Sequence, residues 1–562
     1  MKHPVLTALW IGIGFTIYFC FGIGHYDLFD WDEINFAECA REMLNSNNFL
    51  KVQLYYKPFW EKPPLYIWMQ AMSMKLFGVN AFAARFPNAL CGGITMGLIY
   101  LWGIRYNRLV WSILWMLLLS CCLLPVMYFK SGIIDPWFNL FIISACFVYI
   151  ARPMGYKNAL LSGLLIGLAV LTKGPVALLL FFTGTTVYQL YNKNFGYFFK
   201  ASFWILCGSA LIFPLLWMGS LVLQNESQTL VSFFNYQIRL LKTEDSGHGG
   251  PWFFHPLVLL LGCFPASLFI FFKLENTTQD AYIKQSIRFM YILLITVVTV
   301  FSIVQTKIIH YSSLVYIPMC FIAGYKLQSV KMDLTKFLKI FYWTIAVVIF
   351  SILLGLALFP AWKNQLLRFV PKGTFEFERL QKNYSIPILA LFSSFACIIL
   401  ISSLYNYILK KQQQKILYAM AGLGLAIHVY LLSALPMIGF YSQEDLIDLI
   451  KKYSPGTMLE THGFKSYAPL FYGNAQFQDF NSKQRLQEIE RIESRLLDSG
   501  LDPRVSSGLI HMIWLEEQNQ LQKPVYIIAK QGGGLDLKNN KGFKLIEKRS
   551  GYWVYQKKTP DI

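Results

Sequence analysis

Long apolar runs separated by short polar segments recur along the first 440 residues. The first run, 4–24, ends at His25 and Tyr26 and is long enough to cross the roughly 30 Å of hydrocarbon in a bilayer. Twelve further runs follow, near 82–104, 109–129, 136–151, 158–172, 175–191, 201–222, 254–272, 289–305, 312–326, 338–360, 386–409 and 416–436. The pattern predicts an all-α polytopic membrane domain with about 13 transmembrane helices.

The pattern changes after Phe440, where no further spanning run occurs. Helical periodicity at 443–452, 483–497 and 505–518 alternates with β-rich stretches at 525–529, 543–547 and 552–555. These features predict a small C-terminal soluble α/β domain. The expected domains are therefore 1–440, in the membrane, and 441–562, outside it.

Composition narrows the class of protein further. Of the 562 residues, 55% are hydrophobic and only 14% are charged, which is too few charged residues for the surface of an ordinary soluble protein. The net charge of +19 would suggest a nucleic-acid partner in a soluble protein. In a chain this apolar, basic residues in cytoplasmic loops explain the charge, so no nucleic-acid partner is expected.

The positions of the charged residues predict the orientation. With the N-terminus inside, the inner loops carry 17 Lys and Arg residues against three acids. This bias predicts a multi-pass protein of the inner (cytoplasmic) membrane. An odd number of spans then places the C-terminal domain on the periplasmic side, together with a long first outer loop, about 25–80, that contains interfacial helices.

Residues that can carry chemistry gather in the outer loops. The candidates are Asp32, Glu33, Glu61, Lys62, Asp135, Arg239, His248, Lys307, His310 and Tyr311. Acids, bases and imidazoles on one face of the membrane, supplied by many loops, favour a catalytic cavity at the outer interface. A conduction path would more often place polar residues in the middle of the bilayer.

Asp32 and Glu33 begin an amphipathic helix in the first outer loop. Two acids in a first turn are explained by helix capping and the helix dipole alone. A carboxylate near the interface can also act as a general base on an acceptor hydroxyl. Two adjacent acids do not easily face one site, so we select Asp32 as the base. Glu33 remains a candidate for substrate binding, with a structural role as the alternative.

Several cationic and imidazole side chains also admit two interpretations. Lys62, Arg239 and Lys307 could contact lipid headgroups, or they could hold a phosphate or pyrophosphate. His248 could be an ordinary interface residue, because no metal-ligand spacing surrounds it, and a metal site would need a distant partner such as Glu61.

Five ordered motifs in residues 1–330 carry a resemblance to a known family. They are Asp32-Glu33 with Ala37-Glu38 and Ala40-Arg41-Glu42-Met43-Leu44; Glu61-Lys62-Pro63-Pro64-Leu65 leading to Leu76-Phe77-Gly78 and Arg85; Leu171-Thr172-Lys173-Gly174-Pro175-Val176; His248-Gly249-Gly250-Pro251-Trp252; and Thr306-Lys307 with His310-Tyr311. The set resembles the GT-C glycosyltransferases of the aminoarabinose (lipid A) transferase and protein O-mannosyltransferase-like superfamily. One departure follows the two acids, where the family commonly reads Gly-Arg-Tyr and this chain has Ile34-Asn35-Phe36.

The resemblance implies a GT-C fold and the transfer of one sugar from a polyprenyl-phosphate carrier, with inversion. The implied acceptor is extracytoplasmic and is lipid A or another glycolipid, a polysaccharide or a protein. By resemblance Asp32 and Asp135 are the catalytic acids. The remaining substrate-binding candidates are Glu33, Lys62, Arg239, Lys307, His310 and Tyr311, of which Lys62 and Arg239 would hold the carrier phosphate.

The resemblance also implies a metal site. Glu61 and His248 match positions linked to a divalent metal ion, Zn or Mg/Mn, and no nucleotide cofactor is expected.

Two other functions share the hydropathy pattern. A flippase or transporter of lipid-linked sugars would show ionisable residues in the middle of its spans, and a membrane-anchored sensor would have its function in residues 441–562.

Overall fold

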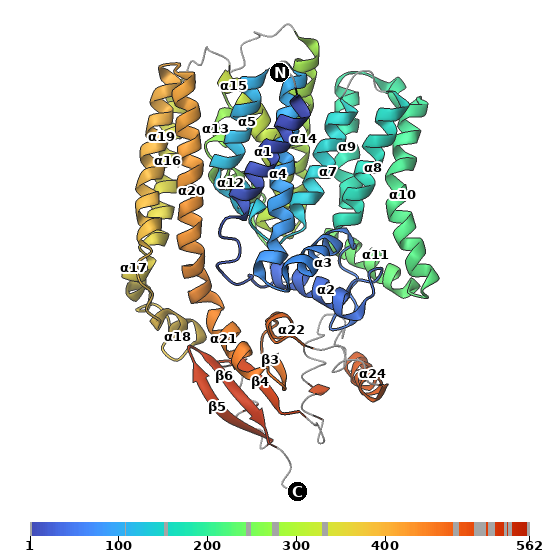
Figure 1. The fold of residues 1–562 in the computed structure, drawn as a ribbon, viewed down its shortest axis with the longest axis vertical. Helices are drawn as coiled ribbons and strands as arrows, with labels where there is room; N and C mark the ends of the chain where they lie inside the picture. The colour runs from blue at the N-terminus through green and yellow to red at the C-terminus, as the bar shows by residue number, and fades with distance from the viewer. Residues whose placement is uncertain are drawn as a thin grey trace.

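The computed structural model of the chain describes residues 3–106, 108–150, 155–242, 249–272, 280–328, 335–475, 483–498, 523–532 and 542–558, together with residues 513, 514, 517 and 537. Most of these residues form a bundle of helices with its two ends at the top and bottom of Figure 1. A layer of short helices crosses the lower end, and a small sheet lies beneath that layer (Figure 1).

Each predicted span has a helical counterpart in the bundle. The helices are α1 (Pro4–Cys20), α4 (Ala81–Arg105), α5 (Leu109–Cys121), α6 (Leu123–Phe129), α7 (Asp135–Tyr149), α8 (Tyr156–Lys173), α9 (Val176–Tyr191), α10 (Ala201–Leu223), α12 (Phe254–Gly262), α13 (Ala266–Phe269), α14 (Ala281–Ile303), α15 (Tyr316–Gln328), α16 (Lys336–Ala357), α19 (Ile388–Leu409) and α20 (Gln413–Ser442). Among the described residues, five helices are long and apolar enough to cross a membrane: α10, α14, α16, α19 and α20. The bent pair α5 and α6 would make a sixth span. The chain is thus a polytopic membrane protein, and the number thirteen stays a prediction.

Short elements connect the bundle helices and cover its lower end. The 3-10 turns are η1 (Phe195–Phe199) and η2 (Ile309–Val315), and α17 (Phe359–Leu366) and α18 (Phe375–Gln381) lie between α16 and α19. The covering layer contains α2 (Asp32–Ser46), α3 (Leu65–Phe77) and α11 (Ser227–Lys242), as Figure 1 shows. The long first loop with helices that was expected is therefore present.

This first loop also contains a β-hairpin, which the all-α expectation missed. Strands β1 (Gln53–Leu54) and β2 (Lys57–Pro58) flank Tyr55 and Tyr56, both in the left-handed backbone region. The buried carboxylate of Glu42 in α2 accepts their backbone N–H groups at 2.7 and 2.6 Å. A tertiary contact thus stabilises a turn that local sequence does not favour.

The C-terminal part has a four-stranded mixed sheet of order β3-β4-β6-β5. Strand β3 (Met458–His462) is parallel to β4 (Val525–Lys530), whereas β6 (Tyr552–Lys557) is antiparallel to both β4 and β5 (Phe543–Arg549). Helices α21 (Glu444–Tyr453), α22 (Ala468–Tyr472) and α24 (Lys483–Asp498) accompany the sheet. The three predicted strands are confirmed and β3 is an addition, while most of the expected helix 505–518 lies outside the described residues.

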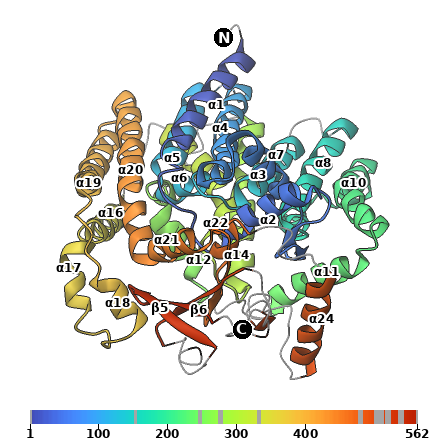
Figure 2. The ribbon, with the colours of Figure 1, turned by 60° about the horizontal axis from the view of Figure 1, so that its bottom comes forward.

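The sheet is connected to the bundle through one buried acid. Asp445 in α21 accepts from Arg379 of α18 at 2.9 Å and from Lys382 at 2.5 Å through one oxygen, and from Arg549 of β5 at 2.9 Å through the other. Figure 2 shows α21 and α22 between the sheet and the helices of the first loop. Helix α22 also packs against α2, so the C-terminal part contacts the layer that covers the bundle.

A second buried ion pair fixes the start of α2. Arg85 in α4 donates from Nε and Nη2 to the two carboxylate oxygens of Glu33, at 2.9 and 2.7 Å. The same carboxylate accepts the backbone N–H groups of Phe29 at 2.9 Å and Gly132 at 2.5 Å. Burial raises the pKa of Glu33, but Arg85 and these N–H groups outweigh burial and hold that pKa below its ordinary value. The guanidinium also donates to the carbonyls of Ile23, Tyr26 and Asp27.

We expect Arg85→Met to destabilise the protein strongly, because it leaves the Glu33 carboxylate buried without its cation. Breaking one side of a buried pair typically costs about 3–5 kcal/mol. Thermal unfolding of the detergent-solubilised chain measures this loss. Arg105→Met is the matched control, since Arg105 is exposed near the other end of the same helix. Equal melting temperatures for the two variants would contradict the assigned role of Arg85.

Candidate functional site

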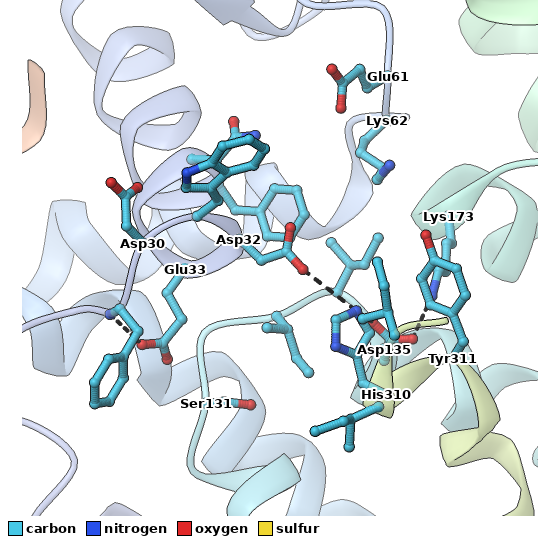
Figure 3. Close-up of a pocket in the computed structure, with 18 of the residues that line it drawn as sticks. Asp30, Asp32, Glu33, Glu61, Lys62, Ser131, Asp135, Lys173, His310 and Tyr311 are labelled. Carbon is cyan, nitrogen blue, oxygen red and sulfur yellow. Dashed lines mark hydrogen bonds and ion pairs between the residues drawn. The ribbon is translucent and has the colours of Figure 1, made fainter. Parts of the chain in front are cut away.

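A cavity of about 940 Å³ lies at the lower end of the bundle, between the bundle helices and the covering layer. The start of α2, residues 60–62, the turn 130–135, α11 and residues 308–311 all line it. Lys465 and Tyr467 of the C-terminal part line it too. Elements far apart in sequence thus enclose one space, with acids and bases drawn from several of them (Figure 3).

Two acids meet around one histidine inside this cavity. The Nε2 atom of His310, on η2, lies 3.4 Å from an oxygen of Asp32 and 3.7 Å from an oxygen of Asp135 (Figure 3). The side chain of Asp32 is 44% exposed, whereas that of Asp135 is 2% exposed. Asp32 is therefore the acid that a bound substrate can reach, whereas Asp135 is buried and contacts the same histidine.

Lys173 completes this cluster. Its Nζ atom lies 2.5 Å from the second oxygen of Asp135 and 4.7 Å from the ring centroid of Tyr311. The ammonium offsets the charge of the buried acid, and Tyr311 is held beside the pair by its cation–π contact. Lys173 was not among the predicted site residues, although the Thr172-Lys173-Gly174-Pro175 motif marked its position.

A pair of cations lines another part of the cavity. Lys62 Nζ and Arg239 Cζ lie 5.3 and 5.2 Å from the ring centroid of Tyr236 in α11. All three residues line the cavity. Both cations therefore lie beside one ring in the cavity wall, and lysine and arginine side chains are the usual partners of a phosphate group.

The structure places two of the predicted substrate-binding residues differently. Lys307 is not among the described residues that line the cavity, and it donates instead to the carbonyls of Phe301, Ser302 and Val304 at 3.0, 2.8 and 2.5 Å. A lysine at this point satisfies the carbonyl oxygens that the end of α14 leaves without partners. Glu33 borders the cavity, but Arg85 and backbone N–H groups donate to both of its carboxylate oxygens. These contacts favour a structural role for Glu33 over substrate binding.

One of the two predicted metal ligands can be placed. Glu61 lines the cavity, and its carboxylate accepts the hydroxyl of Tyr236 at 3.3 Å. His248 lies outside the described residues. No cluster of three or more His, Cys, Asp or Glu side chains suited to a metal occurs in the part of the chain that the structure describes.

The acid just before α2 links the cavity to the C-terminal part. Asp30 lines the cavity and accepts the hydroxyl of Ser466 at 2.5 Å, while its backbone N–H donates to the side chain of Gln443. Burial raises the pKa of Asp30 to about 6, although the Ser466 hydroxyl and nearby cations lower it. Sequence analysis assigned Asp30 no role because its partner is 436 positions away.

A family model matches part of this chain. Residues 61–218, which include Glu61, Lys62, Asp135 and Lys173, match the family described as dolichyl-phosphate-mannose-protein mannosyltransferase. The match covers less than a third of the chain. The resemblance that the loop motifs indicated is confirmed.

Curated relatives agree with this family domain. The chain is 26% identical over 349 residues to the undecaprenyl phosphate-alpha-4-amino-4-deoxy-L-arabinose arabinosyl transferase of Wigglesworthia glossinidia brevipalpis, covering 58% of this chain and 59% of the relative. It is 29% identical over 272 residues to the protein of the same name from Shewanella sediminis, covering 47% and 49%. The matched region thus spans about half to three fifths of the length of these relatives.

Solved structures show the same fold over nearly the whole chain. ArnT from Cupriavidus metallidurans bound to undecaprenyl phosphate superimposes with a TM-score of 0.72 at 16% identity, covering 97% of both chains. The apo form of that protein gives a TM-score of 0.68 at 17% identity. The predicted GT-C fold is confirmed.

We expect the stability of the protein to depend on pH through Asp30. The pKa of Asp30 rises on folding from 3.8 to about 6. Ionisation of this carboxyl group therefore destabilises the fold fully above pH 6, and this cost decreases as the pH falls from about 6 to about 4. From pH 7.5 to pH 5 the wild type should therefore gain about 1 kcal/mol relative to Asp30→Asn.

Thermal unfolding of both proteins at the two pH values measures the effect. Asp498→Asn, at the exposed end of α24, is the control and should follow the wild-type profile. If Asp30→Asn and the wild type keep the same difference at both pH values, Asp30 does not titrate in this range.

Proposed function

We propose that this chain is an integral-membrane glycosyltransferase that moves a single sugar from a polyprenyl-phosphate carrier to an extracytoplasmic acceptor. The observation that carries the proposal is a single cavity that contains a reachable acid, Asp32, and a paired cation site, Lys62 with Arg239. A sugar–phosphate bond needs both, since one group must activate the acceptor and another must stabilise the departing phosphate.

The reaction is a direct displacement at the anomeric carbon. Asp32 takes the proton of the acceptor hydroxyl, and the acceptor oxygen forms the new bond to the anomeric carbon. The bond from that carbon to the phosphate oxygen breaks at the same time, and its electron pair leaves with the polyprenyl phosphate. Lys62 and Arg239 hold the departing charge, and attack from the opposite face inverts the configuration.

Asp135 and His310 position the base. The imidazole lies between the two acids, and the Lys173 ammonium fixes Asp135 from the other side. Such an arrangement restricts the rotamers of Asp32 without occupying its exposed face. Glu61 and His248 would hold a divalent metal ion, which would supply a further electrophile to the reaction. The displacement described above does not depend on it.

The relatives support the class of donor. Their names give undecaprenyl phosphate-linked aminoarabinose as the substrate of those enzymes, and the ArnT structure contains undecaprenyl phosphate. For this chain we propose the same class of carrier and a glycolipid acceptor, with a polysaccharide or a protein as the alternatives that the assay tests. We also propose thirteen spans and an inner-membrane location with the cavity and residues 441–562 on the periplasmic side.

We expect Asp32→Asn to lower kcat by about 100-fold or more, because the amide cannot accept the proton of the acceptor. Transfer of labelled sugar from a polyprenyl-phosphate donor to a glycolipid in proteoliposomes measures the rate. Asp27→Asn is the matched control, since Asp27 lies in the same loop, pairs only with Lys451 among the described residues and is outside the cavity lining. Unchanged turnover in Asp32→Asn would remove the base assignment.

We expect Lys62→Gln and Arg239→Gln each to raise the KM for the donor about tenfold, since a charged hydrogen bond to phosphate contributes about 1.5–3 kcal/mol. The same proteoliposome assay at varied donor concentration measures this change. Lys75→Gln, at the exposed end of α3, should leave KM unchanged. A donor KM that is identical in all three variants would place the carrier phosphate elsewhere.

A further inference from the structure

A buried amide follows Asp135 by one helical turn in α7. Asn139 is only 1% exposed, and it stands inside one of the apolar runs that predict the membrane spans. A polar side chain in such a place costs free energy unless its hydrogen-bonding groups are satisfied, and polar residues within spans are frequently functional. The partners of this amide therefore indicate what it does.

Asn139 donates to two different segments beside the cavity. Its Nδ2 atom donates to the hydroxyl of Tyr128 in α6 at 2.6 Å and to the hydroxyl of Ser313 in η2 at 2.9 Å. The Tyr128 hydroxyl in turn donates to the backbone carbonyl of Asp135 at 2.9 Å. One amide thus connects the helix that begins at Asp135, the end of α6 and the turn that carries His310.

The bond to Ser313 controls the direction of the His310 side chain. Three residues make one turn of a 3-10 helix, so Ser313 and His310 lie on the same side of η2. A hydrogen bond at Ser313 therefore fixes both the distance of η2 from α7 and the rotation of η2 about its own axis. These two quantities determine whether His310 Nε2 reaches Asp135, from which it lies 3.7 Å (Figure 3).

A second buried contact holds η2 from another helix. The Nδ1 atom of His255, in α12, lies 3.1 Å from the hydroxyl of Ser312, and both side chains are fully buried. Successive side chains of a 3-10 helix point in directions about 120° apart, so α7 and α12 fix the turn from two sides. Among the described residues that line the cavity, neither Asn139 nor Ser313 occurs. Asn139 therefore acts on a substrate only through the residues that it holds.

Hydrogen bonds between membrane helices also occur where they only join the helices. Ser162 in α8 makes a bond of this kind, since its buried hydroxyl donates to the carbonyl of Ala145 in α7 at 3.0 Å. Neither of these two residues is among the described residues that line the cavity. The bond of Asn139 differs because both of its partners belong to segments that carry the acids and the imidazole of the site.

We infer that Asn139 is a positioning residue of the transferase, and that it holds η2 in the orientation that places the imidazole of His310 between Asp32 and Asp135. This inference rests on the proposed function, because positioning for catalysis has a meaning only if the chain transfers a sugar. It names the group that sets the mutual geometry of residues already placed in the site.

Two substitutions remove the same hydrogen bond from its two ends. Asn139→Leu keeps the approximate shape of the side chain but cannot donate, and Ser313→Ala removes the accepting hydroxyl. Each should lower kcat about tenfold, because loss of alignment slows the chemical step. Each should leave the KM for the donor within twofold of wild type, since Lys62 and Arg239 lie beside Tyr236 on another part of the cavity wall.

Ser162→Ala is the matched control, since it removes a buried hydrogen bond to the same helix and should leave kcat unchanged. An unchanged kcat in both Asn139→Leu and Ser313→Ala would overturn the inference. A donor KM that rises as much as kcat falls would also overturn it, because that result indicates a general distortion of the cavity.

A double-mutant cycle with His310→Ala tests whether Asn139 acts through the imidazole. In the His310→Ala background, Asn139→Leu should cost less than a further twofold in kcat, since the group that it positions is gone. Losses that multiply would show that Asn139 acts independently of His310, and the inference would be wrong.

Nuclear magnetic resonance of the full-length chain in nanodiscs measures the position of His310 without turnover. With imidazole-labelled histidine the chain gives eight signals, and His310→Gln identifies the relevant one. Asn139→Leu and Ser313→Ala should shift or broaden this signal, whereas Ser162→Ala should leave it in place.

The two measurements separate this inference from the proposed function. A wild type that transfers no sugar, with a His310 signal that responds to Asn139→Leu, would refute the transferase proposal and leave the link between the two residues standing. A wild type that transfers sugar, with a His310 signal that is the same in Asn139→Leu and Ser313→Ala, would refute the inference alone.

Discussion

The buried pair between Glu33 and Arg85 is the contact on which the site depends. A carboxylate and a guanidinium that are both removed from water are stable only when nearly all of their hydrogen-bonding groups are satisfied. Here the partners come from the end of the first helix, the start of α2, helix α4 and the turn at Gly132. Satisfying one ion pair thus brings together the segments that carry Asp32 and Asp135. The proposed base, Asp32, is exposed to the cavity, whereas its neighbour Glu33 is buried in the ion pair.

Acidic and basic side chains lie in different parts of the cavity. The acids and His310 gather on one side, with Lys173 offsetting the buried member of the pair, whereas Lys62 and Arg239 share an aromatic ring on α11. In the proposed reaction, separating the proton acceptor from the cations that would receive the departing phosphate prevents these charges from neutralising each other. A sugar bound between the acids and the cations would be within reach of both sets of charges.

The C-terminal part is an integral part of this arrangement. Asp445 binds three cations from different elements and so fixes the sheet against the helices between α16 and α19. From that position the segment around Ser466 reaches the residues before α2, and Lys465 and Tyr467 enter the cavity wall. Activity that depends on the cavity therefore requires both parts of the chain, which argues against a sensor whose function resides in residues 441–562 alone.

The sequence by itself determined the elements and the class of chemistry. Apolar runs predicted the membrane helices, most of them within a few residues, and β-rich stretches predicted β4, β5 and β6, because burial in lipid or in a sheet restricts the residue types locally. Loop motifs identified Asp32, Asp135, Lys62 and Arg239 as candidates. Tertiary structure alone decided which of the candidates face the cavity, since Glu33 and Lys307 carry the same functional groups as their neighbours and differ only in what they pack against. It also revealed Lys173, Asp30 and Lys465, whose partners are 38 or more than 400 positions away. Ion pairs and hydrogen bonds act over a few ångströms of space, and distance along the chain does not encode them.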